Sequence, residues 1–270
     1  MANWLSYRSP HALDYSHLVK IERRNPTIPE MIVGPDATLR RRDGFKLTDE
    51  RMKNRQVLDE AHYCLYCHER DKDSCSSGFI EKDGSYRQNP LHIPLAGCPL
   101  DEKISEMNLL RGKGDVLGAL ALAIIDNPMC AGTGHRICND CMKACVFQKQ
   151  EPVNIPEIET GTLTDVLKMP YGVEIYALLT RWNPLNIKRP FAAPYNGKNV
   201  LVVGLGPAGY TLAHYLLNEG FGVVGIDGLK IEPLPKELTG EGGNLPRPIR
   251  DWSEIYKQLD ERVLEGRVAV

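Results

Sequence analysis

The segments CLYC, at residues 64–67, and CNDCMKAC, at residues 138–145, enclose a stretch that contains all 8 cysteines of this 270-residue chain. Between the two segments lie Cys75, Cys98, which precedes a proline, and Cys130. Written as spacings, the pattern is C-x2-C-x7-C, then an isolated C-P, then C-x7-C-x2-C-x3-C. Such a density of thiols is typical of disulfide frameworks, zinc sites or iron–sulfur clusters.

The chemistry of these thiols depends on the compartment in which the chain resides. The N-terminal sequence MANWLSYRSPHALDYSHLVKIERR lacks the basic start, unbroken apolar core and small-residue cleavage site of a secretory signal. We therefore expect a reducing, cytoplasmic location, where clustered thiols act as metal ligands or redox groups and disulfides are rare. Inert buried thiols are a further alternative.

Two kinds of metal site fit the cysteine pattern. Tetrahedral zinc sites of mixed cysteine and histidine are one alternative, because the two C-x2-C pairs have histidines nearby. Iron–sulfur clusters explain more of the pattern, because 8 thiolates match two [4Fe–4S] clusters and a Cys-Pro pair recurs in two-cluster ferredoxins. The histidines that could join a zinc site are His62, His68, His92 and His135.

Composition limits the classes of partner. The chain is 42% hydrophobic, which supplies an apolar core, and its net charge of −2 argues against a broad nucleic-acid-binding surface. The basic residues Arg40–Arg42 are interpreted as a solvated face. The longest apolar run, residues 116–125, is about half the roughly 20 residues that a membrane-spanning helix needs. We expect a soluble protein without a membrane span and without a nucleic-acid partner.

Apolar periodicity and helix-breaking residues predict the organisation of the chain. Residues 1–47 read as an irregular N-terminal extension, because prolines and a glycine separate its short apolar pieces. A helix over 48–63 is expected to begin at Thr48, whose hydroxyl can cap it, and to deliver Cys64 to its site. The proline-rich residues 150–198 resemble a bridge between two units. Further helices are expected over 101–110, 114–127, 138–148, 157–168, 171–181 and 251–266.

The expected helix 138–148 carries cysteines at positions i, i+3 and i+7, which share one helical face. Cys138, Cys141 and Cys145 could therefore converge on one side, as ligands rather than as core residues. Cys75 is expected on a polar loop whose backbone amides can point at a sulfur atom. Hydrogen bonds of that kind raise the potential of an iron–sulfur cluster.

The sequence NVLVVGLGPAGYTLAHYLLNEGFGVVGID, residues 199–227, predicts a strand, a glycine turn, a helix and a second strand. Gly204 permits the tight turn, Gly206 lets a pyrophosphate approach the backbone, and Gly209 lets the helix and strand pack closely. The helix N-terminus would face the phosphates. Asp227 follows at about the expected 20 residues and could accept a hydrogen bond from a ribose hydroxyl. A glycine-rich turn without a ligand is the structural alternative.

The predicted strands are residues 199–203 and 222–226, and the predicted helix between them is 207–219. Two strands are fewer than a dinucleotide-binding domain needs, and the loop after Asp227 contains no second glycine fingerprint that follows a strand. We therefore expect that the chain is truncated or that a partner chain completes the sheet.

The cysteine block and the GLGPAG motif together resemble the small subunit of NADPH-dependent glutamate synthase and its relatives. These include the N-terminal part of dihydropyrimidine dehydrogenase and the large subunit of NADH-dependent ferredoxin:NADP oxidoreductases. The resemblance implies an α-helical domain with two [4Fe–4S] clusters, then an FAD domain that an NAD(P)H domain interrupts in full-length relatives. In this family the x-G-P-A-G fingerprint, here with Pro207 and Ala208, holds FAD. The resemblance covers roughly residues 48–228 and rests on CLYC at 64–67, GCPL at 97–100, DNP at 126–128, C-x3-C at 141–145, PVNI at 152–155 and VVGLGPAGYTLAHYL at 202–216.

The resemblance also implies that the ligands of the two clusters interleave along the chain. The fourth ligand of the second cluster is a non-cysteine residue just beyond PVNI in some relatives, and this position falls near Glu159 here. The spacing before the third cysteine is longer than usual and the gap between the sixth and seventh is shorter, so Cys130 is a further candidate ligand. A surface carboxylate on a helix is the alternative interpretation of Glu159. The implied cysteine sets are Cys64, Cys67, Cys75 and Cys145 for one cluster, and Cys98, Cys138 and Cys141 for the other.

We therefore expect an irregular extension over 1–47, an α-helical domain with two [4Fe–4S] clusters over 48–197, and an incomplete α/β Rossmann-type FAD-binding domain over 198–270. The implied function is an oxidoreductase module that passes electrons between NAD(P)H-linked FAD and the clusters to a partner subunit or a missing C-terminal domain. The NAD(P)H domain is expected from the family and absent from these residues, and no catalytic acid–base pair or nucleophile is nominated. The alternative function is a zinc-stabilised nucleotide-binding regulatory or scaffold module without redox activity.

Overall fold

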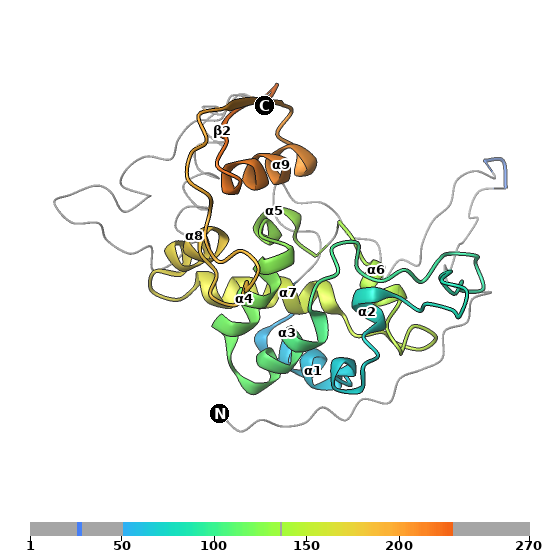
Figure 1. Ribbon diagram of the computed structural model, residues 1–270. Coiled ribbons are helices and arrows are strands. Elements are labelled where there is room, and N and C mark those ends of the chain that lie inside the picture. Colours follow the sequence, from blue (N-terminus) through green and yellow to red (C-terminus); the bar gives the residue numbers. More distant parts are fainter. Residues whose placement is uncertain (1–25, 29–50, 136, 229–270) are drawn as a thin grey trace.

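The structure is a computed structural model that describes residues 26–28, 51–135 and 137–228 (Figure 1). Within these residues a helical bundle is followed by a β–α–β unit. The helix predicted over 251–266 and almost all of the expected extension 1–47 lie outside the described residues. In the described part of the chain, no helix combines the length and the apolarity that crossing a membrane requires.

Longer helices alternate with single helical turns, and the turns carry half of the cysteines. Cys67, Cys75, Cys130 and Cys141 each lie in a helical turn of 4 residues. The helices are α1 (Asn54–Tyr63), η2 (Cys67–Arg70), α2 (Ser74–Ser77), α3 (Ile104–Lys113), α4 (Val116–Asp126), α5 (Cys130–Thr133), α6 (Asp140–Lys143), α7 (Ile155–Leu167), α8 (Gly172–Arg181) and α9 (Pro207–Asn218). The strands are β1 (Asn199–Val203) and β2 (Gly222–Ile226).

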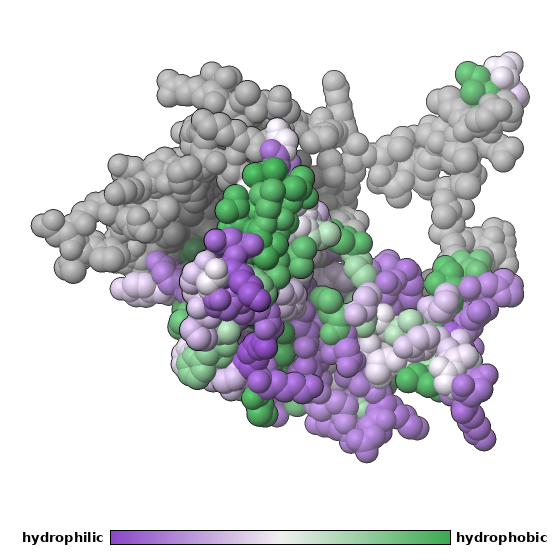
Figure 2. Space-filling view, turned by 45° about the horizontal axis from the view of Figure 1, so that its top comes forward, coloured by the Kyte–Doolittle hydropathy of each residue, from purple (hydrophilic) through white to green (hydrophobic). Residues whose placement is uncertain are grey.

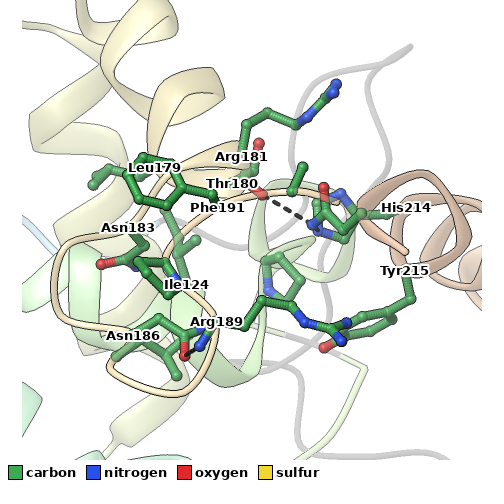
Figure 3. A pocket seen from close by; sticks show the side chains of 15 residues that line it. Ile124, Leu179, Thr180, Arg181, Asn183, Asn186, Arg189, Phe191, His214 and Tyr215 are labelled. Carbon is green, nitrogen blue, oxygen red and sulfur yellow. Dashed lines mark hydrogen bonds between the residues drawn. The ribbon is translucent and has the colours of Figure 1, made fainter. Parts of the chain in front are cut away.

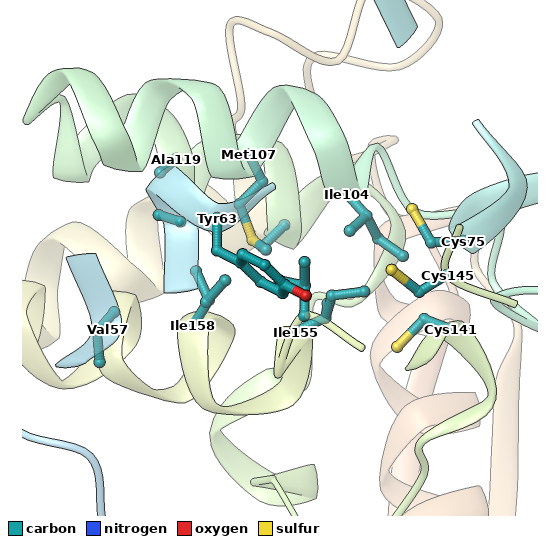
Figure 4. Close-up of a cluster of buried hydrophobic side chains, with 13 residues drawn as sticks. Val57, Tyr63, Cys75, Ile104, Met107, Ala119, Cys141, Cys145, Ile155 and Ile158 are labelled. Carbon is teal, nitrogen blue, oxygen red and sulfur yellow. The ribbon is translucent and has the colours of Figure 1, made fainter. Parts of the chain in front are cut away.

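The main hydrophobic core lies where α1, α3, α4 and α7 pack together (Figure 4). Val57 of α1, Met107 of α3 and Ile158 of α7 are buried in it. Burial of each such side chain stabilises the fold by about 1.5–3 kcal/mol. The cysteines that also belong to this core are Cys75, Cys141 and Cys145, at one side of the cluster in Figure 4.

A buried charge ties α3 to α1 and α7. Arg111 of α3 is 2% exposed, and its Nη2 donates to Asn54 Oδ1 of α1 at 2.9 Å and pairs with Asp165 of α7. Removal of one partner of a buried ion pair costs about 3–5 kcal/mol, because the remaining charge is left uncompensated. The ion pair therefore helps to fix the packing of the three helices that support the cysteine segments.

The strands β1 and β2 are confirmed at the predicted residues, and α9 ends one residue before the predicted Glu219. The strands pair in parallel, with Asn199 opposite Gly222 and Val203 opposite Ile226. Parallel neighbours need a crossover connection, which α9 provides. Within the described residues this sheet contains two strands, so the Rossmann-type FAD domain stays a proposal.

The helix predicted to begin at Thr48 begins instead at Asn54. Lys53, which precedes it, has extended backbone angles, and its N–H donates to the Gln56 side chain at 2.9 Å. This side-chain bond satisfies the start of the helix without the predicted hydroxyl cap. Thr48 itself lies outside the described residues.

The helix predicted over 138–148 is wrong in extent, because only α6 is helical there. The chain leaves helical geometry at Ala144, so Cys138 precedes the helical turn and Cys145 follows it. The prediction that the three cysteines of this segment share one helical face is therefore wrong. The helices predicted over 101–110, 114–127, 157–168 and 171–181 are confirmed as α3, α4, α7 and α8, with ends shifted by a few residues.

Candidate functional site

Four of the cysteines line a single cavity. They come from the end of α1, from η2, from α2 and from the segment after α6. These four, Cys64, Cys67, Cys75 and Cys145, are the set that the family resemblance implies for the first cluster. The other lining residues are Leu65, Ser74, Ser105, Asn108, Val146, Phe147, Val153 and Ile155.

The thiols around this cavity influence one another electrostatically. Burial, together with the nearby thiols of Cys145 and Cys67, raises the pKa of Cys64 to about 11. Burial and the carboxylate of Asp73 raise the pKa of Cys75, whose Sγ donates to Asp73 Oδ1 at 3.0 Å. Thiolates in such a site need a positive partner, because a buried negative charge is otherwise unfavourable.

Hydrogen-bond donors point at the sulfur atoms of this group. Burial raises the pKa of Cys145, and the backbone N–H groups of Phe147 and Val153 oppose the rise by donating to its sulfur. Burial also raises the pKa of Cys64, and the fully buried side chain of Asn108 opposes that rise. The amide of Asn108 has no nitrogen or oxygen partner. Donors of this kind stabilise the ligand sulfur of iron–sulfur sites.

Three further cysteines form a second group next to the first. Burial raises the pKa of Cys141, and the thiol of Cys98, the carboxyl of Glu102 and the thiol of Cys138 add to the rise. The backbone N–H of Cys98 donates to the carbonyl of Cys75 at 2.9 Å, so the two groups adjoin. Cys145 lines the cavity of the first group, whereas Cys141 belongs to the second group. The two thiols therefore do not share one helical face, contrary to the prediction from the sequence.

Cys130 and Glu159 lie near each other, apart from the seven other thiols. Burial and the carboxyls of Glu159 and Glu102 raise the pKa of Cys130. Glu159 is partly buried rather than a surface carboxylate, and its Oε1 accepts from Asn127 Nδ2 at 2.8 Å. Burial raises the pKa of Glu159 to about 7. Glu102, which the sequence patterns did not single out, neighbours both this pair and the second cysteine group.

The histidines that could join a zinc site have other surroundings. His92 is exposed. In the described residues, no three histidine, cysteine, aspartate or glutamate side chains converge as a single metal ion requires. A [4Fe–4S] cube does not need that convergence, because each cysteine binds a different iron. The contacts of the other three are His62 Nε2 with the Gly112 carbonyl at 3.1 Å, His68 Nδ1 with Ser105 Oγ at 2.6 Å, and His135 Nε2 with Glu157 Oε1 at 3.3 Å.

The glycine turn after β1 joins the strand closely to α9. Gly204 has a φ of +89°, in the left-handed region that favours glycine. A Cβ at Gly209 would overlap the carbonyl oxygen of Gly204, so only glycine lets α9 pack on the turn. A Cβ at Gly206 would meet nothing within 4 Å, so the backbone there is open to an approaching group. The tight turn at Gly204 and the close packing at Gly209 are as predicted. Cofactor binding by this turn, at Gly204, Gly206 and Gly209 and at Pro207 and Ala208, stays a prediction.

Asp227 lies beside this turn at the end of β2. Its carboxylate accepts hydrogen bonds from the backbone N–H groups of Leu205 and Gly228. The side chain therefore connects the end of the second strand to the glycine turn. Its contact with a ribose hydroxyl stays a prediction, and the carboxylate would accept that hydrogen bond in addition to those from the two amides.

Contacts along α9 fasten the β–α–β unit to the helical bundle. The Tyr210 hydroxyl lies against Gly132 of α5, and Asn218 Nδ2 donates to the Thr180 carbonyl at the end of α8 at 3.2 Å. A cavity lies between α9 and the segment that follows α8 (Figure 3). These contacts hold the unit against α5, which carries Cys130, and against the end of α8. The cavity lining includes Ile124, Arg181, Asn183, Phe191, His214 and Tyr215.

One face of β1 and β2 is hydrophobic and exposed. Leu201 pairs with Val224 and Val203 pairs with Ile226, and paired residues of parallel strands point to the same face. These four side chains are between 47% and 75% exposed. Figure 2 shows hydrophobic side chains gathered over this unit. Exposed apolar areas of this kind mark surfaces that other chain segments or partners cover.

Comparison with known proteins gives relatives without an assigned activity. No protein-family model matches the chain. "Uncharacterized protein RP006" of Rickettsia prowazekii (strain Madrid E) is 54% identical over 138 residues, which are 51% of this chain and 19% of that protein. "Uncharacterized protein RP005" of the same organism is 44% identical over 71 residues, 22% of this chain and 22% of that protein. The chain thus spans about a fifth of the length of each relative, and its activity, cofactors and partners are proposals.

Proposed function

We propose that this chain is an iron–sulfur flavoprotein module that passes electrons between FAD and two [4Fe–4S] clusters, and onward to a partner subunit or domain. The proposal follows the resemblance to the glutamate synthase small subunit. The observation that supports it best is the grouping of cysteines from distant segments, with four of them around one cavity. Their distribution matches the interleaved ligand sets that the family uses.

The chemistry of the donor atoms fits iron–sulfur clusters. The first set supplies four thiols around one cavity, two of them buried, and hydrogen-bond donors reach its sulfur atoms from the backbone and from Asn108. The second set supplies three thiols with buried carboxyls beside them. When bound, the clusters and FAD would supply the electron-accepting and electron-donating chemistry, while the protein sets their positions and potentials.

The residues of the chain would act by binding and tuning rather than by acid–base catalysis. Backbone amides and buried side chains stabilise negative charge on ligand sulfur, which raises the potential of a bound cluster. The carboxylate of Asp73 lies beside two thiols of the first set and would act in the opposite direction. In the first set, the hydrogen-bond donors would therefore raise the potential of a bound cluster, and the Asp73 carboxylate would lower it.

The glycine turn is proposed to hold the pyrophosphate of FAD. The open backbone at Gly206 and the N-terminus of α9 offer unsatisfied amides and a partial positive charge to a phosphate group. Contacts between α9 and α5 would keep this site against the part of the helical bundle that carries Cys130. A short separation between the flavin and the clusters would favour electron transfer.

A partner is proposed to complete the electron path. The exposed hydrophobic face of β1 and β2 supports a further domain or partner subunit that covers the sheet. The hydride donor NAD(P)H is proposed to bind in that partner or further domain, as the family resemblance implies. The chain would then hold electrons without oxidising NAD(P)H by itself.

The zinc-stabilised regulatory module remains the second candidate function, and a specific observation disfavours it. Three of the four histidines that mixed zinc sites would need are within hydrogen-bond distance of backbone or side-chain groups instead.

Anaerobic purification followed by metal, sulfide and flavin analysis tests the proposed function. We expect brown, oxygen-sensitive protein that contains iron and acid-labile sulfide and releases FAD on denaturation. Addition of NADPH should leave the flavin absorbance unchanged, and prompt bleaching would show that the chain binds the nucleotide by itself. Colourless protein with stoichiometric zinc and little iron would overturn the proposal in favour of the zinc module.

A further inference from the structure

The segment that follows α8 is a closed loop, residues 182–191, which we call the α8 loop; it borders the cavity drawn in Figure 3. Its two ends, Trp182 and Phe191, form an antiparallel bridge, and their rings stack with centroids 6.3 Å apart. Asn183 is 5% exposed, and its Nδ2 donates to the Ala121 carbonyl of α4 at 2.7 Å. The base of the α8 loop is therefore fastened to the helical bundle.

Hydrogen bonds from its own side chains also fix the backbone of the α8 loop. Asn183 Oδ1 accepts from the backbone N–H of Leu185 at 3.1 Å, and Asn186 Oδ1 accepts from that of Arg189 at 3.1 Å. Side-chain-to-backbone bonds of this kind stabilise turns. The loop thus presents Ile187, which is 93% exposed, on a defined turn.

The apolar side chains of the α8 loop are exposed and differ between its tip and its base. The tip carries the aliphatic residues Ile187 and Leu185, and Leu185 is 43% exposed. The base carries the aromatic residues Trp182 and Phe191, which are 39% and 66% exposed. Exposed apolar patches mark protein or membrane contacts. An aliphatic tip above an aromatic base matches the order of a membrane interface, where aromatic rings lie at the level of the headgroups.

Positive charge accompanies these apolar side chains. Residues 175–218 contain four lysines and arginines and no acidic residue, although the whole chain carries a net charge of −2. Arg181 is exposed at the base of the α8 loop and Lys188 is exposed at its tip. Arg189 pairs with Glu219, the first acidic residue after this stretch. The α8 loop and its surroundings therefore complement an anionic surface.

We propose that the α8 loop docks the protein on an anionic lipid surface. Its aliphatic tip would enter the acyl region, its aromatic base would lie among the headgroups, and Arg181 and Lys188 would contact lipid phosphates. A contact of this kind lies on the bilayer and needs no membrane-spanning helix. An acidic protein would complement the cations equally well, whereas the order of aliphatic and aromatic side chains favours a bilayer. The inference needs neither the clusters nor FAD, so it is independent of the proposed function.

Co-sedimentation of the anaerobically purified full chain with vesicles tests this docking. We expect binding to phosphatidylcholine vesicles that contain about 30% phosphatidylserine, little binding to phosphatidylcholine alone, and weaker binding as the salt concentration rises. Lys188→Ala should lower the partition coefficient about fivefold, because a cation near an anionic membrane contributes about 1 kcal/mol. Lys82→Ala, which removes an exposed lysine outside the α8 loop, should leave it unchanged.

A second pair of variants tests the apolar tip. Ile187→Asp should lower the partition coefficient at least tenfold, because the side chain no longer enters the acyl region, and its thermal unfolding should match the wild type. Ile80→Asp makes the same change at an isoleucine that is 60% exposed outside the α8 loop, and should bind almost as well as the wild type.

Three results would overturn the proposal: no binding to the anionic vesicles, equal losses in Ile187→Asp and Ile80→Asp, or equal losses in Lys188→Ala and Lys82→Ala. Self-association of the chain that Ile187→Asp abolishes, without binding to vesicles, would also overturn it and would assign the α8 loop to a protein interface.

Discussion

The phenol oxygen of Tyr210, the residue after the glycine fingerprint, lies against Gly132, two residues after Cys130. A Cβ at Gly132 would come within 2.6 Å of that oxygen, so a side chain at this position would force the Tyr210 ring to shift. Burial raises the pKa of Tyr176, and Cys130 and Tyr210 beside it add to the rise. The helix behind the proposed flavin site therefore packs directly on the segment that carries a cysteine.

Gly132→Ala should destabilise the protein through this contact. Overpacking of a close contact costs about 1–3 kcal/mol in the free energy of unfolding, which urea denaturation measures. In a Tyr210→Ala background the same substitution should cost much less, because the clashing ring is gone. Equal costs in the two backgrounds would mean that the clash with Tyr210 is not the cause.

Gly206→Ala and Gly209→Ala should separate binding from folding. An added Cβ at Gly206 meets nothing within 4 Å, so thermal stability without ligand should stay near the wild-type value while FAD affinity falls. An added Cβ at Gly209 overlaps the Gly204 carbonyl, so this variant should lose both stability and FAD binding. Calorimetry and flavin fluorescence measure the two properties. Undiminished FAD affinity in Gly206→Ala would show that the flavin lies elsewhere.

Asp165→Ala should reduce the free energy of unfolding by about 3–5 kcal/mol, because it leaves the charge of Arg111 buried and unpaired. A matched control is Asp59→Ala, which removes the exposed Arg55–Asp59 pair at 3.2 Å and should cost less than about 0.5 kcal/mol. Chemical denaturation of both variants checks the difference. Similar losses would show that burial of Arg111 does not set the cost.

Asp73→Asn should make the thiols of the iron-free chain more reactive. Burial is the largest cause of the raised pKa of Cys67 and Cys75, and the negative charge of Asp73 adds to both. Removal of that charge lowers both pKa values, and each unit of decrease raises the thiolate fraction about tenfold below the pKa. Iodoacetamide alkylation between about pH 7 and 10 should therefore begin at lower pH in the variant.

The effect of Asp73→Asn should be confined to the first cysteine group. Peptide mass spectrometry can compare the alkylation of Cys67 and Cys75 with that of Cys138, which belongs to the second group and serves as an internal control. Alkylation of Cys138 should keep its wild-type pH dependence. An unchanged profile at Cys67 would contradict the electrostatic coupling.

The β–α–β unit is predictable from sequence because its signals are local. Residues 199–203 are mostly apolar and are followed by Gly204, a pattern typical of a short buried strand. Gly209 is typical of a helix that packs closely on the turn that precedes it. The roles of these glycines depend on residues close to them in the chain. The strand positions are accordingly found at the predicted residues.

The cysteine region could be predicted only in part, because spacing does not show which way a side chain faces. Cys141 and Cys145 satisfy a helical pattern, yet the helical turn ends at Lys143 and the two thiols join different groups. The family resemblance anticipated that division, whereas helical periodicity did not. Glu102 carries no sequence signal, because an acidic residue just before a helix is common, and only the fold buries it beside the thiols.

The measurement that tests the account most directly is the iron content and electron paramagnetic resonance spectrum of anaerobically reconstituted wild-type protein, Cys75→Ala and Cys141→Ala. We predict about eight irons in the wild type and two distinct reduced-cluster signals. Each variant should lose the signal of its own group and keep the other. Identical losses in both variants, or zinc in place of iron in the wild type, would contradict the division of the cysteines into two cluster-binding sets.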